Sequence, residues 1–252
     1  MVDDDNTKEP VKRNLSSSPF MILSKPSDQF RETIEHLGGS GLTADDLTRI
    51  KMPTGGRTIW DLPGLGGGEP RREFHGLILA MHDTRALWNP AAELSGSSRP
   101  PDCSSPDARF GFGTPSGECG RCPKAQFGSG PGGEGQACKL TRQVFVLRPE
   151  NLLPEILLVP PSSLKVVKKF VVELLTANIP VCAVPTRFGL ERTTNARGIA
   201  YSKLVLTSDG QLTPEQLQII KDYIVAIAPL LKAPDSVPRV NDVAEPGDEE
   251  VL

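Results

Sequence analysis

Four of the five cysteines have the type and spacing to bind one metal ion. Cys103, Cys119, Cys122 and Cys138 follow the pattern C-x15-C-x2-C-x15-C. Two residues between the central thiols let both sulfurs face one ion, and Gly120 permits the tight turn. The outer cysteines would complete a shell of four thiolates, which is typical of structural zinc and leaves no open position for a substrate. We therefore predict a structural zinc site.

Two other chemistries use the same residues. Four thiolates also suit an iron–sulfur cluster, which would give an iron–sulfur enzyme. Alternatively, the four cysteines form two disulfides or remain free thiols. The fifth cysteine, Cys182, lies in an apolar segment and is interpreted as a small buried residue of a strand.

The segment that carries the four cysteines, residues 95–138, has almost no apolar core of its own. Nine glycines and four prolines lie between Cys103 and Cys138. An irregular insertion of this length needs a reason, and metal binding would supply much of its folding free energy. Because the loop is too glycine-rich to bury large rings, we expect Phe110, Phe112 and Phe127 to be exposed.

No recognisable catalytic motif accompanies the cysteines. The three histidines, His36, His75 and His82, are isolated in the sequence. The sequence contains neither a phosphate-binding G-x-x-x-x-G-K-[ST] motif nor a G-x-G-x-x-G motif between a strand and a helix. No pair of carboxylates indicates general acid–base catalysis. We therefore expect a protein that is not an enzyme.

The composition favours short strands and long loops over a helical bundle. Of the 252 residues, 24 are glycine, 24 are proline and only 5% are aromatic. The acidic N-terminus lacks the features of a signal peptide, and no apolar run is long enough for a membrane span. We expect a cytoplasmic protein without a membrane partner, where reduced thiols favour metal ligation over disulfides.

The elements that would position these residues follow from periodicity and turn signals. A capping box, Thr213 with Gln216, opens the last predicted helix, and Ser162 or Ser163 is the predicted N-cap of the middle helix. A capped turn is predicted at 43–47, and 20–23 is interpreted as a short strand or an anchoring segment. The predicted strands are 49–53, 58–62, 74–82, 143–147, 155–159, 181–185 and 198–206, and the predicted helices are 27–37, 164–175 and 213–232. We expect one domain over 19–232, between a disordered segment 1–18 and an acidic disordered tail 233–252.

Charge is distributed unevenly along the chain. Residues 139–205 hold ten basic and four acidic residues, whereas 233–252 hold six acidic residues and one basic residue. A basic body with an acidic tail is typical of proteins that bind single strands, although a solvated surface with an acidic end gives the same count. The candidate phosphate-binding residues are Lys139, Arg142, Lys165, Lys168, Lys169, Arg187, Arg192, Arg197 and Lys203.

Binding of single strands also needs aromatic rings on which bases stack. Phe188 is preferred outside the cysteine segment, because 186–192 reads as a polar, basic stretch between two strands. Phe110, Phe112 and Phe127 are the candidates within it. Tyr201 is a weaker candidate, and Trp60 and Trp88 are more typical of a core.

The order of the predicted elements resembles the OB-fold single-stranded DNA-binding proteins of phages and mobile elements. The resemblance rests on 161–165 opening a helix, on 195–202 entering the last strand, and on the acidic end at 247–252. It implies a mainly β protein with α-helix: an OB-like barrel with a four-cysteine metal-binding insertion and a C-terminal helix. In that family the acidic tail recruits replication or recombination proteins, and some members contain structural zinc.

The sequence thus favours a sequence-nonspecific single-stranded DNA-binding protein of a replication or recombination system. A zinc-stabilised protein-interaction or transcription-accessory module without DNA binding is the alternative, and an iron–sulfur enzyme is the second alternative.

Overall fold

The computed structural model describes residues 20–23, 32, 41–64, 66–88, 100–195 and 198–232, which form a mainly β structure with few helices. The predicted disordered segment 1–18, the acidic tail 233–252 and nearly all of the predicted helix 27–37 lie outside these residues. Within the described ranges, no helix has both the length and the apolar character needed to cross a membrane.

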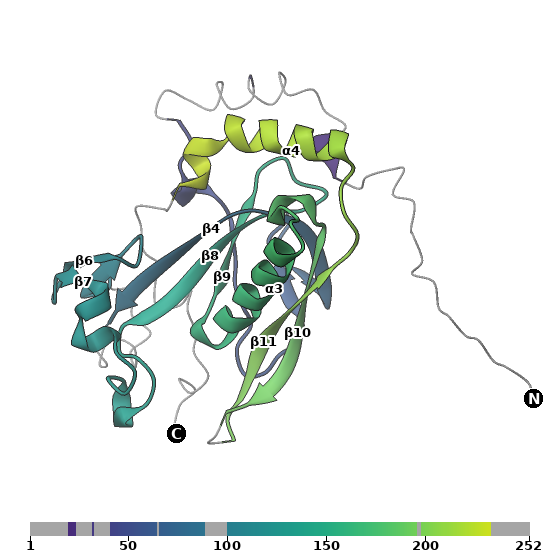
Figure 1. Ribbon diagram of the computed structural model, residues 1–252. Helices are drawn as coiled ribbons and strands as arrows, with labels where there is room; N and C mark the ends of the chain where they lie inside the picture. Colours follow the sequence, from purple (N-terminus) through teal and green to yellow (C-terminus); the bar gives the residue numbers. More distant parts are fainter. Residues whose placement is uncertain are drawn as a thin grey trace, which may run out of the picture.

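A mixed, open sheet forms the centre of the molecule (Figure 1). Its central strands, in spatial order, are β1 (Arg49–Ile50), β9 (Glu155–Val159), β8 (Lys139–Leu147) and β4 (Glu73–Leu87). The first residues of β4 also pair with β10 (Thr186–Thr194), which forms a hairpin with β11 (Ala200–Ser208). Only β1 and β9 run parallel; the other pairs among these strands are antiparallel. One edge of β4 therefore continues into the β10–β11 hairpin.

Strand β9 and the last five residues of β8 are buried on both faces, which explains the apolar runs 144–147 and 156–159. Successive side chains of a strand point to opposite faces. Phe145 and Leu147 therefore belong to one hydrophobic cluster, while Val144 and Val146 belong to another.

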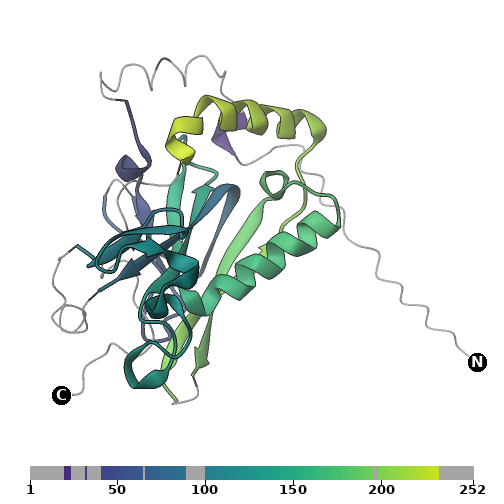
Figure 2. The ribbon, with the colours of Figure 1, turned by 60° about the vertical axis from the view of Figure 1, so that its left-hand side comes forward.

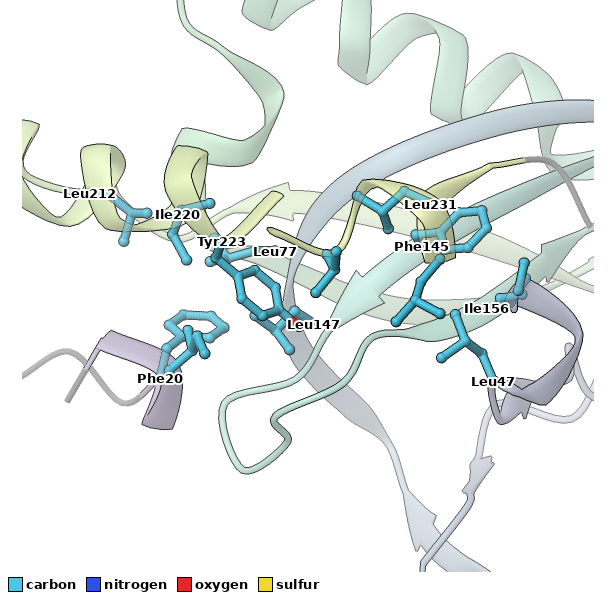
Figure 3. Packing of buried hydrophobic residues seen from close by; sticks show 14 of the residues in the cluster. Phe20, Leu47, Leu77, Phe145, Leu147, Ile156, Leu212, Ile220, Tyr223 and Leu231 are labelled. Atoms are coloured by element: carbon cyan, nitrogen blue, oxygen red, sulfur yellow. The ribbon is translucent and has the colours of Figure 1, made fainter. Parts of the chain in front are cut away.

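The first cluster lies between the sheet and α4 (Pro214–Ala226) (Figure 3). Tyr223 of α4 packs in this cluster and its hydroxyl donates a hydrogen bond to the Leu152 carbonyl at 2.6 Å. Segment 20–23 was predicted to be a short strand or an anchoring segment, and it is an anchoring segment. Its η1 (Met21–Leu23) is a 3-10 turn, and Phe20 and Ile22 are buried in the cluster. The short helix η8 (Ala228–Leu231) follows α4 and adds Leu230 and Leu231.

The second cluster lies between the sheet, the hairpin and α3 (Leu164–Thr176), which Figure 2 shows crossing beside β10 and β11. Phe74 of β4 stacks on Phe188 of β10 with ring centroids 4.7 Å apart, and Trp60 meets Phe74 edge-on at 5.2 Å. The Trp60 Nε1–H donates to the Phe188 carbonyl at 3.1 Å. These contacts join three segments that are far apart in the sequence.

The predicted closed barrel is not found in the described part of the chain, where the sheets are open. Closure would require β9 to pair with β11, but β1 occupies that edge of β9. Residues of β11 make other hydrogen bonds instead: the Ser202 hydroxyl donates to the Arg57 carbonyl at 2.6 Å, and the Leu204 N–H donates to Ser163 Oγ at 3.1 Å. Segment 49–57, which contains β1 and Arg57, thus takes the place of the expected pairing between β9 and β11.

Several predicted elements are confirmed with shifted ends. The predicted strand 155–159 coincides with β9, and 143–147 and 74–82 are the inner parts of the longer β8 and β4. The capping box is present: the Thr213 N–H donates to Gln216 Oε1 at 2.9 Å, and the Gln216 N–H donates to Thr213 Oγ1 at 3.3 Å. The capped turn at 43–47 is η2 (Ala44–Asp46). Ser163 stands at the N-cap of α3, after η6 (Pro161–Ser163), but makes no capping hydrogen bond.

Other predictions were wrong. Residues 181–185 do not form a strand, because η7 (Val181–Ala183), which contains Cys182, is a 3-10 turn. Residues 186–192 are not a loop between strands but most of β10. The predicted strands 49–53 and 58–62 are too long, since they shrink to β1, which pairs with β9, and β2 (Trp60–Leu62), which pairs with β3 (Glu69–Arg71).

Candidate nucleic-acid interface and four-cysteine lobe

Residues 103–138, here called the four-cysteine lobe, lie at the far end of β4 from the hairpin (Figure 1). The lobe begins where Cys103 pairs with Leu87, the last residue of β4. Its elements are β5 (Cys103–Ser105), β6 (Phe110–Gly113), β7 (Gly117–Glu118), η3 (Cys119–Arg121), η4 (Pro123–Ala125) and η5 (Pro131–Gly133). The lobe therefore extends the sheet through a small three-stranded branch.

The four predicted cysteines lie close together: Cys103, Cys122 and Cys138 belong to one small hydrophobic cluster, and Cys119 lies near enough to Cys103 and Cys138 to raise the pKa of their thiols. Cys103, Cys119 and Cys138 are buried and Cys122 is half-buried, whereas Cys182 lies apart in η7. Two successive turns shape the central pair: the Cys122 N–H donates to the Cys119 carbonyl at 3.3 Å, and the Ala125 N–H donates to the Cys122 carbonyl at 3.0 Å. The last cysteine is held to the same turn, because the Cys138 N–H donates to the Lys124 carbonyl at 2.8 Å.

Gly111 of β6 faces this cluster and has no room for a side chain. A Cβ atom at Gly111 would lie 2.8 Å from the Cys103 Sγ and 3.8 Å from the Cys119 Sγ. The first and second cysteines of the pattern therefore flank one point, although they are separated by a turn and two strands. This close approach is the reason for glycine at this position.

The thiols of Cys103 and Cys138 are shifted toward their protonated forms. Burial raises the pKa of Cys138 to about 11, and the neighbouring Cys119 and Cys103 add to this while Arg85 opposes it. Burial also raises the pKa of Cys103, and Cys119 and Cys122 contribute. A metal ion would have to displace these protons, so its affinity should rise with pH.

The donor set matches four-thiolate zinc in type and number, but the thiols are not arranged around a point. Across the described residues, no group of three or more His, Cys, Asp or Glu side chains is placed to hold a metal ion. Zinc, like the iron–sulfur alternative, therefore stays a prediction that rests on the shared cluster and the knuckle turns.

The aromatic residues of the lobe are exposed. Phe110 and Phe112 are 47% and 61% exposed, with ring centroids 5.5 Å apart, and Phe127 is 83% exposed. Alternation along β6 places these two rings opposite Gly111 and therefore opposite the cysteines. One four-residue strand thus carries an aromatic pair on its outer face and contacts the thiols with its inner face.

Asp107 organises the turn that leads into this aromatic pair. Its Oδ1 accepts hydrogen bonds from the Arg109 N–H at 2.8 Å, the Ser105 hydroxyl at 3.1 Å and the Phe110 N–H at 3.3 Å. The hydrogen bond from the Arg109 N–H is the main cause that lowers the pKa of Asp107 below its usual value. The ionised Asp107 carboxylate therefore fixes the backbone of the turn that precedes β6.

Phe188 was the preferred stacking residue outside the lobe, and the prediction that it stacks on bases is wrong. It is only 1% exposed, because alternation within β10 turns it into the second hydrophobic cluster against Phe74. Trp60 and Trp88 are buried, and Tyr201 is half-buried. The described rings available for stacking are therefore those of the lobe.

The predicted basic residues lie on four elements, β8, α3, β10 and β11, rather than on one. Arg142 is held by the Asp83 carboxylate through two hydrogen bonds of 2.6 and 2.9 Å. Three more make ion pairs: Lys203 with Glu191 at 2.7 Å, Lys169 with Glu173 at 3.6 Å, and Arg187 with Glu73 at 3.7 Å. Lys165, Lys168 and Arg192 are exposed, Lys139 is half-buried, and Arg197 lies outside the described residues.

Three basic residues of the lobe itself were missed. Arg109 directly precedes β6, Arg121 lies in η3 and Lys124 lies in η4, and all three are exposed. They precede the basic region 139–205 in the sequence. Their position next to or near Phe110, Phe112 and Phe127 in the sequence is the signal that could have identified them.

Comparison of the chain with protein-family models, with curated proteins and with solved structures finds no match.

Proposed function

We propose that this chain is a sequence-nonspecific single-stranded DNA-binding protein that acts in replication or recombination without catalysis of its own. The observation that carries the proposal is the set of three exposed phenylalanines on the four-cysteine lobe, interspersed with Arg109, Arg121 and Lys124. Exposed rings that stack on bases, beside cations that neutralise phosphates, are what single-strand binding requires.

Zinc would support this surface rather than take part in chemistry. Cys103, Cys119, Cys122 and Cys138 would hold the ion, and a closed four-thiolate shell supplies folding free energy and rigidity. Because Gly111 touches two of these residues, a rigid cluster would fix the position of β6 and of its aromatic pair.

The strand order supports an OB-like origin for the body. The sequence β4, β8, β9, α3, β10, β11, with β10 beside β4, follows the OB arrangement in which a helix separates the third and fourth strands. The outer face of the second and third strands is a usual binding surface of that fold. Here that face of β8 is buried at Thr141, Gln143 and Phe145, so we place binding on the lobe instead.

The test is fluorescence anisotropy with labelled oligo-dT at low and moderate salt, with metal content read on the same sample. We expect salt-sensitive binding and about one zinc per chain. The double change Phe112→Ala with Phe127→Ala should cost about 1–3 kcal/mol per stacked base. Val225→Ala on α4, an exposed apolar residue of the body, is the matched control and should bind as the wild type does.

A second candidate is a zinc-stabilised protein-interaction module, because an exposed aromatic cluster also fits a protein partner. Zinc without oligonucleotide affinity at low salt would exclude the first proposal and leave this one. A brown protein with broad visible absorbance would instead identify an iron–sulfur cluster.

A further inference from the structure

A second exposed feature lies at the opposite end of β4, on the outer face of the β10–β11 hairpin. It is a groove of about 560 Å³, bounded by Ile59, Arg72, Arg187, Gly189 and Val205 among others. The volume lies within the range of about 300–1,000 Å³ that small-molecule sites occupy. The groove is therefore large enough for a nucleotide base with its sugar.

Gly189 lies across from Val205, in the middle of the hairpin pairing and on its outer face. Its φ lies outside the left-handed region, and a Cβ atom there would make only ordinary contacts, 3.9 Å from the Val205 Cβ and 4.0 Å from its carbonyl oxygen. Neither the backbone nor the packing therefore requires glycine. Glycine weakens a strand interior and often marks the close approach of a ligand.

The walls of the groove combine aliphatic surface with positive charge. Ile59 and Val205 are 51% and 36% exposed and line the same groove, so they give it two aliphatic walls. Arg72 is exposed, and Arg187 is partly exposed beside Glu73, the one acidic residue that lines the groove. A flat base matches the aliphatic walls, and two guanidinium groups match the phosphates on either side of it.

We propose that this groove binds one nucleotide of the single strand, with the base over Gly189 between Ile59 and Val205 and the phosphates at Arg72 and Arg187. The inference rests on the proposed function and adds to it a second site on the body. It also explains how the body can contribute to single-strand binding although the outer face of β8 is buried.

The two sites are connected by β4, since Glu73 pairs with Gly189 and Leu87 pairs with Cys103. A strand of this length spans at most about 45 Å, at roughly 3.3 Å per residue. An oligonucleotide must therefore cover several nucleotides to reach both sites, in keeping with the roughly 4–16 nucleotides that single OB folds occupy.

The decisive variant is Gly189→Val, which fills the groove without changing charge and suits a strand. We expect its urea midpoint to equal or exceed that of the wild type, while its affinity for an oligo-dT of about 16 nucleotides falls roughly tenfold. The double change Arg72→Ala with Arg187→Ala should lower the slope of log K against log salt by about 1.4. Lys221→Ala with Lys232→Ala, on α4 and after η8, removes the same charge and should leave both quantities unchanged.

Photo-cross-linking with an iodouracil-substituted strand gives an independent readout and should label peptides that contain Ile59 or Val205. The inference is overturned if Gly189→Val binds as the wild type does while the Phe112→Ala, Phe127→Ala variant weakens, a result that leaves the proposed function intact. It is also overturned if Gly189→Val abolishes binding of an acidic peptide but not of DNA. Absence of any oligonucleotide binding by the wild type would instead refute the proposed function, and this inference with it.

Discussion

At the scale of single residues, Gln143 is the least expected side chain in the molecule. It is fully buried in β8, opposite His82 and Leu158, and neither polar atom of its amide has a hydrogen-bond partner within the described structure. The His82 ring already has a hydrogen-bond partner, since its Nε2 lies 2.6 Å from the Leu231 carbonyl oxygen. A buried amide without partners costs free energy, because it loses its hydrogen bonds to water.

Replacing Gln143 with methionine keeps the side-chain volume and removes both unpartnered atoms. We expect Gln143→Met to raise the free energy of unfolding by about 1–3 kcal/mol, measured by urea denaturation. Thr141→Val, two residues away on the same face, should do the opposite, because it breaks the 2.9 Å hydrogen bond between the Thr84 and Thr141 hydroxyls. A less stable methionine variant would contradict the unpartnered state of the amide.

Single residues also account for why Phe188 could not be placed from sequence. Its neighbours Arg187, Glu191 and Arg192 are polar, so the segment reads as an exposed loop. Only the pairing with β4 and β11 shows that Arg187 and Glu191 occupy one face of a strand and Phe188 the other. The pairing with β4 joins segments more than a hundred residues apart, which local periodicity does not reveal.

At the scale of elements, the four-cysteine lobe was predicted well in position and poorly in detail. The high glycine content correctly predicted that its phenylalanines are exposed, because this follows from local composition, whereas the metal ion stays a prediction from the cysteine spacing. The three short strands could not be predicted, since β5, β6 and β7 contain few residues with strand propensity and form by extending the edge of β4.

The lobe and the body should respond separately to loss of a thiolate. We expect Cys119→Ser to abolish zinc binding and to increase amide hydrogen exchange across 103–138, while β8 and β9 keep their protection, because these strands belong to clusters that do not contain the cysteines. Cys182→Ser is the matched control and should retain the zinc. Equal loss of protection in both regions would show that the lobe is not a separate unit.

The Asp107 turn gives the lobe a defined response to acid. Because the pKa of Asp107 is lowered in the folded protein, its stabilising contribution is complete above its ordinary pKa of about 3.9 and is lost as the pH falls through the lowered value. The Arg109 and Phe110 amide resonances should therefore shift only below about pH 4. Asp107→Asn should remove this titration, and a midpoint at or above the ordinary pKa in the wild type would refute the role of the turn.

At the scale of the whole molecule, the sequence predicted a mainly β protein with a terminal helix but not the open sheet. Strand order and the helix between β9 and β10 follow from hydrophobic pattern and capping signals. The missing closure depends on segment 49–57, in which β1 pairs with β9 and the Arg57 carbonyl accepts a hydrogen bond from Ser202 of β11. A two-residue strand such as β1 carries too little sequence signal to predict a parallel pairing.

The long separations within the second hydrophobic cluster also set an order of assembly during synthesis. The Trp60 ring donates a hydrogen bond to Phe188, which lies 128 residues later in the chain. This part of the body therefore cannot finish folding until the β10–β11 hairpin has left the ribosome. The pairings of the lobe, by contrast, all fall between residues 85 and 138. We expect the lobe to acquire its structure first, so that the proposed zinc ion would bind while the rest of the protein is still being made.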